Sequence, residues 1–549
     1  MSIEPTASAP AQGEGLAPPD PSTAGGSPGG AAIRARNTVI FSVLTGLSRV
    51  AGLAREIVAS SYFATSGAFS AFTIAFQIPN VVRSLFADAA LSAAFVPVFT
   101  EMLEQGRKKE AFRLASTLFF LMLAVLGAIT VLFMLTAGLI IPLFVGAKLH
   151  ALDGLTVGLA RVLFPVVLVL GLNGLVVGML NAYDHFTIPA LSPLVWNAVI
   201  LFCLVGSQQV LSGDKQLYGY AVGVLVGTAV QFTMALPTLR RLGFRLELSF
   251  SFRDPQVRKV LRLMLPVTIG LGLINFNVLI NSTLGSLVSE GAPRAIDAAF
   301  RIYMLPQGMF SVAIATVLFP ALSRYAARRD YDGLRELTAG GMRQILLMLV
   351  PAAAATLALS TPITRLIYQH GAFGPKSTDL VSGALFWFSF SLPFSGLNLL
   401  LTRTFFSLQK PWITTAIAAL NLGVNVIVSV ALYKPFGIPG IVAGTGVSSA
   451  VMTFAQVHYL RRELHGRLGG RRTAIVALQI AIASVLLGVA SYLTWRSLDE
   501  LLGRGLPAQM LSVGIGLAAG LAVYAAAVAF QRIPEGAQIG RMVAGRLRR

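Results

Sequence analysis

The chain has 549 residues, of which 55% are hydrophobic and only 12% are charged, and its mean hydropathy is +0.73. Soluble globular proteins average about 25% charged residues, so this composition excludes a soluble fold. Apolar stretches long enough to cross a bilayer as helices recur from Asn37 to Phe530. These stretches do not alternate polar and apolar residues as the strands of a membrane barrel do. We therefore predict an all-α polytopic membrane protein.

The net charge of +20 does not indicate a nucleic-acid partner, because the basic residues gather in every second loop. Cys203 is the one cysteine and lies in an apolar run, so an intrachain disulfide is excluded. The five histidines lack the spacing of metal ligands, and the apolar segments contain no nucleophile–base pair or paired acids. We therefore expect neither an enzyme nor a bound cofactor or metal.

In chain order, residues 1–36 form a tail rich in Pro, Gly, Ala and Ser, without the hydrophobic centre of a signal peptide. We expect this tail to be disordered and cytoplasmic. About 14 membrane-spanning helices follow it. Their predicted ranges are 37–62, 68–104, 110–146, 152–182, 187–207, 217–238, 256–288, 293–324, 336–367, 377–407, 411–433, 438–460, 473–495 and 507–530.

The loops predict the orientation of the chain. With the N-terminus inside, the inner loops and tails carry 29 lysines and arginines, whereas the outer loops and helix ends carry 8, Arg294 among them. An excess of this kind marks the cytoplasmic side of a membrane protein. Both termini are therefore expected to be cytoplasmic.

An internal repeat divides the predicted helices. The second span contains AFTIAFQIPNVVRSLFADAALSAAFVPVF and the eighth contains AFRIYMLPQGMFSVAIATVLFPAL. Pro79 matches Pro306 at an offset of 227, and Pro97 matches Pro320 at an offset of 223. Two six-helix halves of the same orientation would place a substrate site between them. The alternative is that proline recurs by chance in apolar sequence.

The repeat predicts four parts after the disordered tail. They are an N-terminal six-helix lobe at 37–240, a C-terminal six-helix lobe at 241–470, two additional transmembrane helices at 471–530 and a basic cytoplasmic tail at 531–549. The two additional helices are rich in small residues, which permit close packing and leave a shallow apolar trough.

Six arginines lie inside apolar segments, where a charge near the bilayer centre costs roughly 2.5–3.5 kcal/mol. Such residues are kept where they face a wet space, and several guanidinium groups around one space indicate an anionic ligand. Two of the six, Arg161 and Arg343, lie near enough to a helix end to reach the membrane surface. The six are Arg49, Arg55, Arg83, Arg161, Arg301 and Arg343.

The motif SRVAGLARE concentrates charge in the first predicted span. Ser48, Gly52 and Arg55 share one stripe of a helix, and Arg49 and Glu56 share the neighbouring stripe. We assign Ser48 and Glu56, together with the two arginines, to a candidate substrate-binding site. The alternative is a set of buried ion pairs between helices, which would not exclude a cavity.

The second span adds a Pro-Asn pair followed by Arg83 and Asp88, and in the eighth span Arg301 precedes the matching proline. A proline leaves a backbone carbonyl unbonded and kinks the helix, and such breaks often line a cavity. Arg83, Asp88 and Arg301 therefore join the candidate site. An ion pair between Arg83 and Asp88 is the alternative.

Four amides stand in the seventh and eleventh spans, Asn277 with Asn281 and Asn421 with Asn425. Intramembrane amides usually join helices through hydrogen bonds. An ion site formed by Asn281, Asn421 and Asn425 is the less favoured alternative.

Three motifs resemble the lipid II flippase family, MurJ or MviN, of the multidrug/oligosaccharidyl-lipid/polysaccharide exporter superfamily. They are SRVAGLARE, AFQIPNVVRSLFADAALSAAFVPVF and LPQGMFSVAIATVLFPALS, within a resemblance that covers residues 37–530. The resemblance implies a monomeric flippase in the bacterial inner membrane. Its substrate would be the undecaprenyl-pyrophosphate-linked disaccharide-pentapeptide of peptidoglycan biosynthesis, moved from the cytoplasmic to the outer leaflet by alternating access. The family's cavity arginines match Arg49, Arg55, Arg83 and Arg301, and its two last helices hold the lipid tail.

The chain departs from the family at charged positions. Acids that some members carry beside the eighth-span arginine are missing, and Asp297, one turn before Arg301, is a candidate substitute. Asn281 and Asn425 stand where members with a sodium site carry acids, so sodium coupling is not expected. Two alternatives remain, a polysaccharide-lipid flippase of the same superfamily and a cation-coupled multidrug exporter, which would need a carboxylate-lined cavity.

Overall fold

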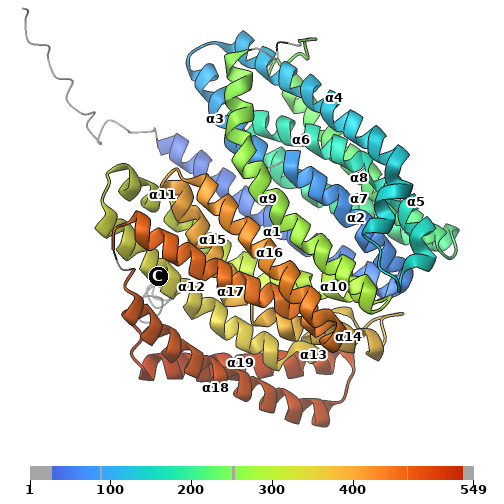
Figure 1. Cartoon of the computed structure of the whole chain (residues 1–549), viewed down its shortest axis with the longest axis vertical. Coiled ribbons are helices and arrows are strands. Elements are labelled where there is room, and N and C mark those ends of the chain that lie inside the picture. Colours follow the sequence, from blue (N-terminus) through green and yellow to red (C-terminus); the bar gives the residue numbers. More distant parts are fainter. Residues whose placement is uncertain (1–27, 87–88, 250, 252–253, 467, 536–549) are drawn as a thin grey trace, which may run out of the picture.

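The computed structural model describes residues 28–535 except 87–88, 250, 252–253 and 467 (Figure 1). Every regular element in this part of the chain is a helix. Among the described residues, 11 helices are long and apolar enough to cross a membrane, and up to 12 if the pair α14 (Pro375–Ser389) and α15 (Leu392–Ser407), bent by 51°, is one span. The all-helical membrane fold is confirmed, and the predicted count of 14 spans agrees with it roughly.

The first half of the chain begins with α1 (Pro28–Phe63). This helix starts before the predicted position Asn37, so residues 28–36 are helical and the prediction of disorder was wrong for them. Residues 1–27 of the predicted tail lie outside the described residues. The following helices are α2 (Gly67–Phe86), α3 (Ala89–Glu104), α4 (Lys108–Ile140), α5 (Asp153–Leu163), α6 (Pro165–Ala182), α7 (Thr187–Val210) and α8 (Lys215–Arg241).

The second half contains α9 (Pro255–Val288), α10 (Ala292–Pro306), a π-helical turn η3 (Gln307–Ser311), α11 (Val312–Ala327), α12 (Tyr331–Ala358), α13 (Ser360–Tyr368), α14, α15, α16 (Pro411–Phe436), α17 (Ile438–Glu463), α18 (Gly470–Leu502) and α19 (Leu506–Phe530). Buried apolar side chains form two clusters, one from residues 59–279 and one from residues 284–533. In Figure 1, α2–α8 lie on one side and α11–α17 on the other, and α9 runs between them. The helix α9 packs against α2 and α16 and so joins the two bodies.

The two copies of the repeat differ at their matching prolines. In the first copy, Pro79 lies inside α2. In the second, α10 ends at Pro306 and passes through η3 into α11. Proline lacks a backbone N–H and removes one hydrogen bond of the helix, and a π-helical turn is one way to absorb the resulting misfit.

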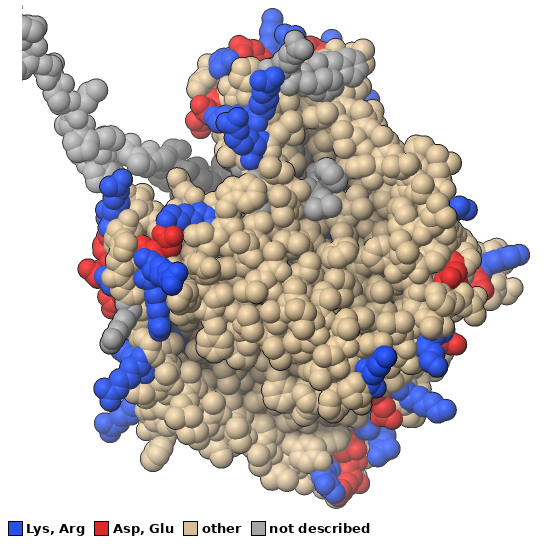
Figure 2. All heavy atoms as spheres, viewed as in Figure 1, with Lys and Arg blue, Asp and Glu red and all other residues tan. Residues whose placement is uncertain are grey.

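Charged side chains occupy two opposite edges of the molecule in the face that Figure 2 shows, and the belt between them is almost free of charge. The apolar residues on this belt and elsewhere include many that are more than half exposed, such as Leu135, Phe202 and Phe454. A belt of this kind matches the hydrocarbon layer of a membrane, with the charged edges at the two surfaces.

The two C-terminal helices pack on the outside of the second body, α18 against α12 and α19 against α18 (Figure 1). Tyr524 of α19 donates a hydrogen bond to the Leu347 carbonyl of α12 at 2.7 Å. Beyond α19, Glu535 forms a buried ion pair with Arg343 of α12. Arg343 is only 8% exposed, and the carboxylate that it meets lies just beyond the end of the last helix.

Arg161 is exposed, whereas Arg343 is buried. The Nε of Arg161 donates to the Met134 carbonyl at 3.1 Å. This arginine lies away from the interface between the two bodies, so it offers a natural control for substitutions in the cavity.

Removal of the carboxylate of Glu535 should destabilise the protein strongly. The change Glu535→Gln leaves the Arg343 guanidinium charged and buried, and breaking one side of a buried pair typically costs about 3–5 kcal/mol. We expect a clearly lower melting temperature in detergent, measured by intrinsic fluorescence, and recovery in the double variant Arg343→Met/Glu535→Leu. The control Glu500→Gln removes the exposed pair with Arg496 and should change little. Equal melting temperatures for the two glutamine variants would contradict the role of the pair.

Candidate functional site

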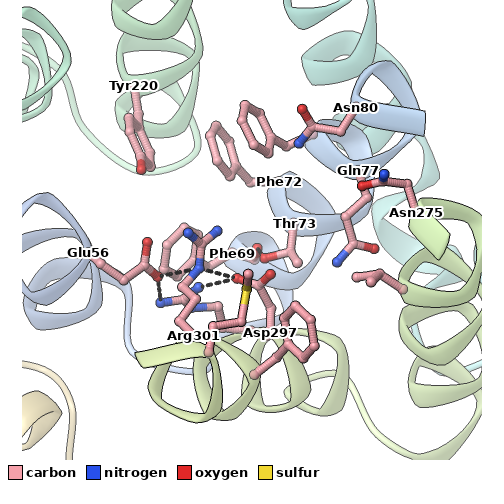
Figure 3. Close-up of a pocket in the computed structure, with 15 residues that line it drawn as sticks. Glu56, Phe69, Phe72, Thr73, Gln77, Asn80, Tyr220, Asn275, Asp297 and Arg301 are labelled. Carbon is pink, nitrogen blue, oxygen red and sulfur yellow. Dashed lines mark hydrogen bonds and ion pairs between the residues drawn. The ribbon is translucent and has the colours of Figure 1, made fainter. Parts of the chain in front are cut away.

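A cavity of about 170 Å³ lies between α1, α2, α8, α9 and α10 (Figure 3). It has a charged end, an uncharged polar wall and an aromatic side. The charged end is formed by Glu56, Arg294, Asp297 and Arg301, the polar wall by Thr73, Gln77, Asn80 and Asn275, and the aromatic side by Phe69, Phe72, Phe76, Tyr220 and Phe300. Since α1 and α2 belong to the first half of the chain and α10 to the second, the cavity lies between the halves.

Glu56 of α1 connects the two halves at the charged end. Its carboxylate forms an ion pair with Arg294, and its Oε1 lies 3.4 Å from the Nε of Arg301. The same Arg301 Nε donates to Asp297 Oδ2 at 2.8 Å, one helical turn away on α10. Arg301 keeps 34% of its side chain exposed, so its guanidinium can meet a ligand in the cavity.

Arg294 is the most deeply buried charge of this cluster, with 1% of its surface exposed. Its Nη1 donates to Asp297 at 2.9 Å and its Nη2 to Ser60 at 2.7 Å, and its guanidinium lies 4.2 Å from the centre of the Phe69 ring. Arg294 lies in the first turn of α10, in agreement with its assignment to outer loops and helix ends, but its place in this cluster was not predicted. A signal was present in the sequence, because Arg294, Asp297 and Arg301 stand at i, i+3 and i+7 and so share one helix face.

Arg55 lies beside the charged end, on the side of α7. It is 7% exposed, and its guanidinium lies 4.9 Å from the centre of the Trp196 ring. Its Nε is buried and makes no hydrogen bond with any residue that the structure describes. Trp196 is itself fixed by a hydrogen bond from its Nε1 to Thr228 at 3.0 Å. The indole thus holds the Arg55 side chain while leaving donors of its guanidinium available.

Ser48 and Gly52 serve the packing of α1 on α7. The Ser48 carbonyl accepts a hydrogen bond from Asn197 Nδ2 at 3.4 Å. A Cβ at Gly52 would lie 3.6 Å from Asn197 Oδ1, which is ordinary contact. The stripe predicted to face the substrate therefore contacts α7 through its backbone.

Arg49 and Arg83, like Arg55, are not among the residues that line the cavity. Arg49 is exposed, and its guanidinium lies beside Gly308 of η3. A Cβ added to Gly308 would be 3.2 Å from the Arg49 Nη1. Arg83 donates from Nε to Asn80 Oδ1 at 3.3 Å, so it contacts the polar wall. Asp88 lies outside the described residues. The structure thus gathers Arg55, Glu56 and Arg301 at one place, with Arg49 and Arg83 flanking it.

The cluster carries excess positive charge. Three guanidinium groups, those of Arg55, Arg294 and Arg301, face two carboxylates, those of Glu56 and Asp297. Buried charges are retained when they are paired and hydrogen-bonded, and an unbalanced positive charge in a low-dielectric site favours an anionic ligand. Guanidinium groups are suited to phosphate because their N–H donors match two oxygens at once.

The four asparagines form a network between α9, α16 and α17. Asn277 donates to Asn421 at 3.2 Å, Asn425 donates to Asn281 at 2.9 Å and also to Asn277, and Asn281 donates to Thr445 at 2.9 Å. Their amides are thereby largely satisfied by one another, as expected of residues that join helices. This arrangement favours the packing role over the ion site.

The end of the molecule beyond the charged cluster is closed by contacts between turns of the two halves. Thr65 and Ser377 share a hydrogen bond of 2.7 Å between their hydroxyls, and the Ala372 N–H donates to the Ser61 carbonyl at 2.7 Å. A Cβ at Gly291 would lie 2.6 Å from the Thr65 carbonyl oxygen. Closure therefore depends on a backbone approach that only glycine permits at this position.

Comparison with solved structures identifies the class of protein. The chain shares its fold with the structure titled "Lipid II flippase MurJ, inward closed conformation", with a TM-score of 0.75, 22% identity, and coverage of 90% of this chain and 99% of that chain. An inward-facing multidrug resistance MATE family transporter of the MOP superfamily matches with a TM-score of 0.64 and 14% identity, over 78% of this chain and 98% of that chain. These likenesses show that the chain shares the fold of both of these membrane proteins.

Sequence comparison gives the family. The family model "Lipid II flippase MurJ" matches residues 59–511. The probable lipid II flippase MurJ of Rhizobium meliloti (strain 1021) is 30% identical over 494 residues, which cover 88% of this chain and 91% of that protein. That of Rhizobium tropici is 31% identical over 467 residues, 83% of this chain and 86% of that protein. The chain belongs to the lipid II flippase MurJ family, which confirms the resemblance found in the sequence.

A methyl group at Gly291 should open the closed end. In Gly291→Ala the Cβ would lie 2.6 Å from the Thr65 carbonyl oxygen, while the backbone φ of −83° suits alanine. We expect spin labels at Lys148 and Lys376, in a Cys203→Ser background, to show a longer distance by pulsed electron resonance. The control Gly154→Ala places its methyl group in open space on α5 and should leave the distance unchanged. An unchanged distance in Gly291→Ala would show that close approach of glycine is not what closes this end.

Proposed function

We propose that this protein moves lipid II, the undecaprenyl-pyrophosphate-linked disaccharide-pentapeptide, from the cytoplasmic to the outer leaflet of the bacterial inner membrane by alternating access. The observation that carries the proposal is the positively charged cluster around Glu56 and Arg301, in a cavity between two helical halves. Membership of the lipid II flippase family supports the choice of substrate.

The pyrophosphate would bind at the charged end. Arg301 is partly exposed there, and Arg55 has a buried donor without a protein partner. Two guanidinium groups can share the oxygens of one pyrophosphate through paired, charge-assisted hydrogen bonds. Arg294 is fully enclosed, so we assign it to holding Glu56 and Asp297 in place, and we assign ligand contact to Arg301 and Arg55.

Glu56 would couple binding to the change of conformation. In the closed arrangement its carboxylate neutralises Arg301 and Arg294 across the interface between the halves. A pyrophosphate that takes over Arg301 competes with Glu56 and weakens the attraction that holds the halves together. A ligand shifts a conformational equilibrium only through such differential contacts.

The closed end would face the outside of the cell and the open end the cytoplasm. The excess of basic residues in the loops at the other end supports this orientation, with both termini inside. The cavity of about 170 Å³ is smaller than the roughly 300–1,000 Å³ of ordinary ligand sites. The halves must therefore separate further before a disaccharide-pentapeptide is accommodated. The exposed Arg49 lies toward the predicted cytoplasmic end, where the headgroup would enter.

The lipid tail would run along α18 and α19, outside the two halves. These helices pack on α12 and expose many apolar side chains, including Leu478, Val485 and Leu521. A long prenyl chain cannot enter a charged cavity without losing its apolar surroundings. We propose a monomer as the working unit, since each chain supplies both halves of the cavity and the tail surface.

A cation-coupled drug exporter fits the cavity less well. A cationic drug would have to bind next to Arg55, Arg294 and Arg301, which outnumber the two carboxylates. A polysaccharide-lipid flippase would share the pyrophosphate chemistry, and rescue of cells depleted of their own lipid II flippase separates it from the proposed function.

Replacement of the cavity arginines by lysine should impair transport although the charge is kept. Lysine cannot make the planar two-point contact with phosphate oxygens. For Arg301→Lys and for Arg55→Lys we expect about a tenfold or greater loss of lipid II translocation in proteoliposomes, as for the loss of one charge-assisted hydrogen bond. Arg161→Lys, on the exposed surface of α5, should transport normally. Equal transport by all three variants, at equal protein levels, would show that two-point contact of arginine with phosphate oxygens is not required.

Removal of the C-terminal helices should abolish preference for long tails. Deletion of residues 470–549 also removes Glu535 and Asp499, which pair with Arg343 and Arg365. The truncated protein should therefore be made with Arg343→Met and Arg365→Gln. We expect a monodisperse protein that binds short-tailed and long-tailed lipid II analogues equally, whereas the full chain prefers the long-tailed one. Retained preference in the truncated protein would place the tail elsewhere.

A further inference from the structure

The polar wall of the cavity contains a buried amide without a protein partner. Gln77 of α2 is 7% exposed, and both its Oε1 and its Nε2 are enclosed without a hydrogen bond to any described residue. In Figure 3 its side chain points into the cavity, across from Arg301 and Asp297. Two neighbouring polar side chains of α2 have partners of their own, since Thr73 donates to the Phe69 carbonyl at 2.9 Å and Asn80 accepts from Arg83 at 3.3 Å.

Such an amide is costly for the fold. Each buried donor or acceptor left unsatisfied costs about 1–3 kcal/mol, because it has lost its water without a replacement. A leucine or methionine at position 77 would fill the same space without that cost. The arrangement is therefore unfavourable for stability, and a bound partner would have to satisfy the amide.

The chemistry of the amide indicates the partner. Gln77 offers one acceptor oxygen and one donor nitrogen side by side. A peptide bond offers the complementary pair, a carbonyl and an N–H. The charged groups of the cavity lie at the opposite end, with Arg301, so the pyrophosphate would not compete for Gln77.

We propose that Gln77 forms a subsite for an amide group of the peptide stem of the lipid-linked headgroup. This inference rests on the proposed function, because it assigns a part of that substrate to the polar wall. The pyrophosphate lies at Arg301 and Arg55, and the peptide lies along α2, where Gln77 hydrogen-bonds one of its amides. Asn80, held by Arg83, stands one turn further along the same helix and extends the polar wall.

The subsite also gives Arg83 a role, although Arg83 lies away from the charged end of the cavity. Its Nε donates to the Oδ1 of Asn80, which lines the cavity, and so fixes the orientation of that amide. Arg83 is thus a positioning residue for the polar wall, whereas Arg301 contacts the anion.

The test compares stability and binding in the full-length protein. The variant Gln77→Met keeps the length of the side chain and removes both polar atoms. The ligands are lipid II, the same lipid without its peptide, and undecaprenyl pyrophosphate, each measured by native mass spectrometry. The control Asn173→Leu removes a buried amide of α6, with an unbonded Oδ1, that lies outside the cavity.

We expect Gln77→Met to raise the melting temperature and to weaken binding of lipid II by about fivefold or more, as for the loss of one or two hydrogen bonds. Binding of the two lipids that lack the peptide should stay at the wild-type value. Asn173→Leu should also raise the melting temperature but leave all three affinities unchanged.

Two results would overturn the proposal. A lower melting temperature in Gln77→Met would show that the amide has a partner within the protein. Equal weakening for lipids with and without the peptide would show that Gln77 does not recognise the peptide. Failure of the proposed function is a separate result, visible in the wild-type protein as absence of lipid II binding.

Discussion

The attraction between Glu56 on α1 and the two arginines of α10 is the interaction on which the rest of the site depends. It joins two halves of the chain that also meet through the packing of α9 on α2 and through the contacts of Thr65 with Ser377 and of Ser61 with Ala372. Taking these charges out of water is expensive, and only close pairing with hydrogen bonds offsets that cost. Asp297, Ser60 and the Phe69 ring provide the additional contacts that Arg294 needs. Arg294 is therefore held from three directions besides its pair with Glu56.

The two arginines of α10 differ in how deeply their side chains are buried. Arg294 is enclosed on every side, so its charge is committed to Glu56 and Asp297. Arg301 shares the same carboxylates but keeps a third of its side chain exposed. The same residue type is thus enclosed at position 294 and partly open to the cavity at position 301, two turns later on the same helix face. Burial, which the sequence does not state, decides between the two.

Ion pairs also hold the two C-terminal helices, α18 and α19, against the rest of the molecule. Among the residues that the structure describes, two arginines away from the cavity meet carboxylates of the C-terminal segment. Arg343 meets Glu535, and Arg365 lies 3.5 Å from Asp499, so the pair α18 and α19 is fastened to α12 and α13 near both its ends. Such contacts matter for helices in a membrane, because apolar contacts with lipid do not hold helices together.

The sequence by itself determined the class of the fold. Long apolar runs, the distribution of basic residues and the repeated prolines were sufficient for a helical membrane protein of two related halves, because lipid permits few backbone structures. The motifs around Arg49, Arg55, Arg83 and Arg301 were sufficient for the family. These features are local, and each can be recognised within about one helix length.

Only the tertiary structure decided which charges meet. Glu56 and Arg294 are 238 positions apart, and nothing in either segment states that α1 and α10 approach each other. Arg294 was counted with the outer loops and helix ends, and its contact with Glu56 was not predicted. Glu535 was expected in the C-terminal tail, and its contact with Arg343 was not predicted either. Both contacts were missed for one reason: the energy of a buried charge depends on the partner that folding brings to it, and the distance along the chain does not contain that information.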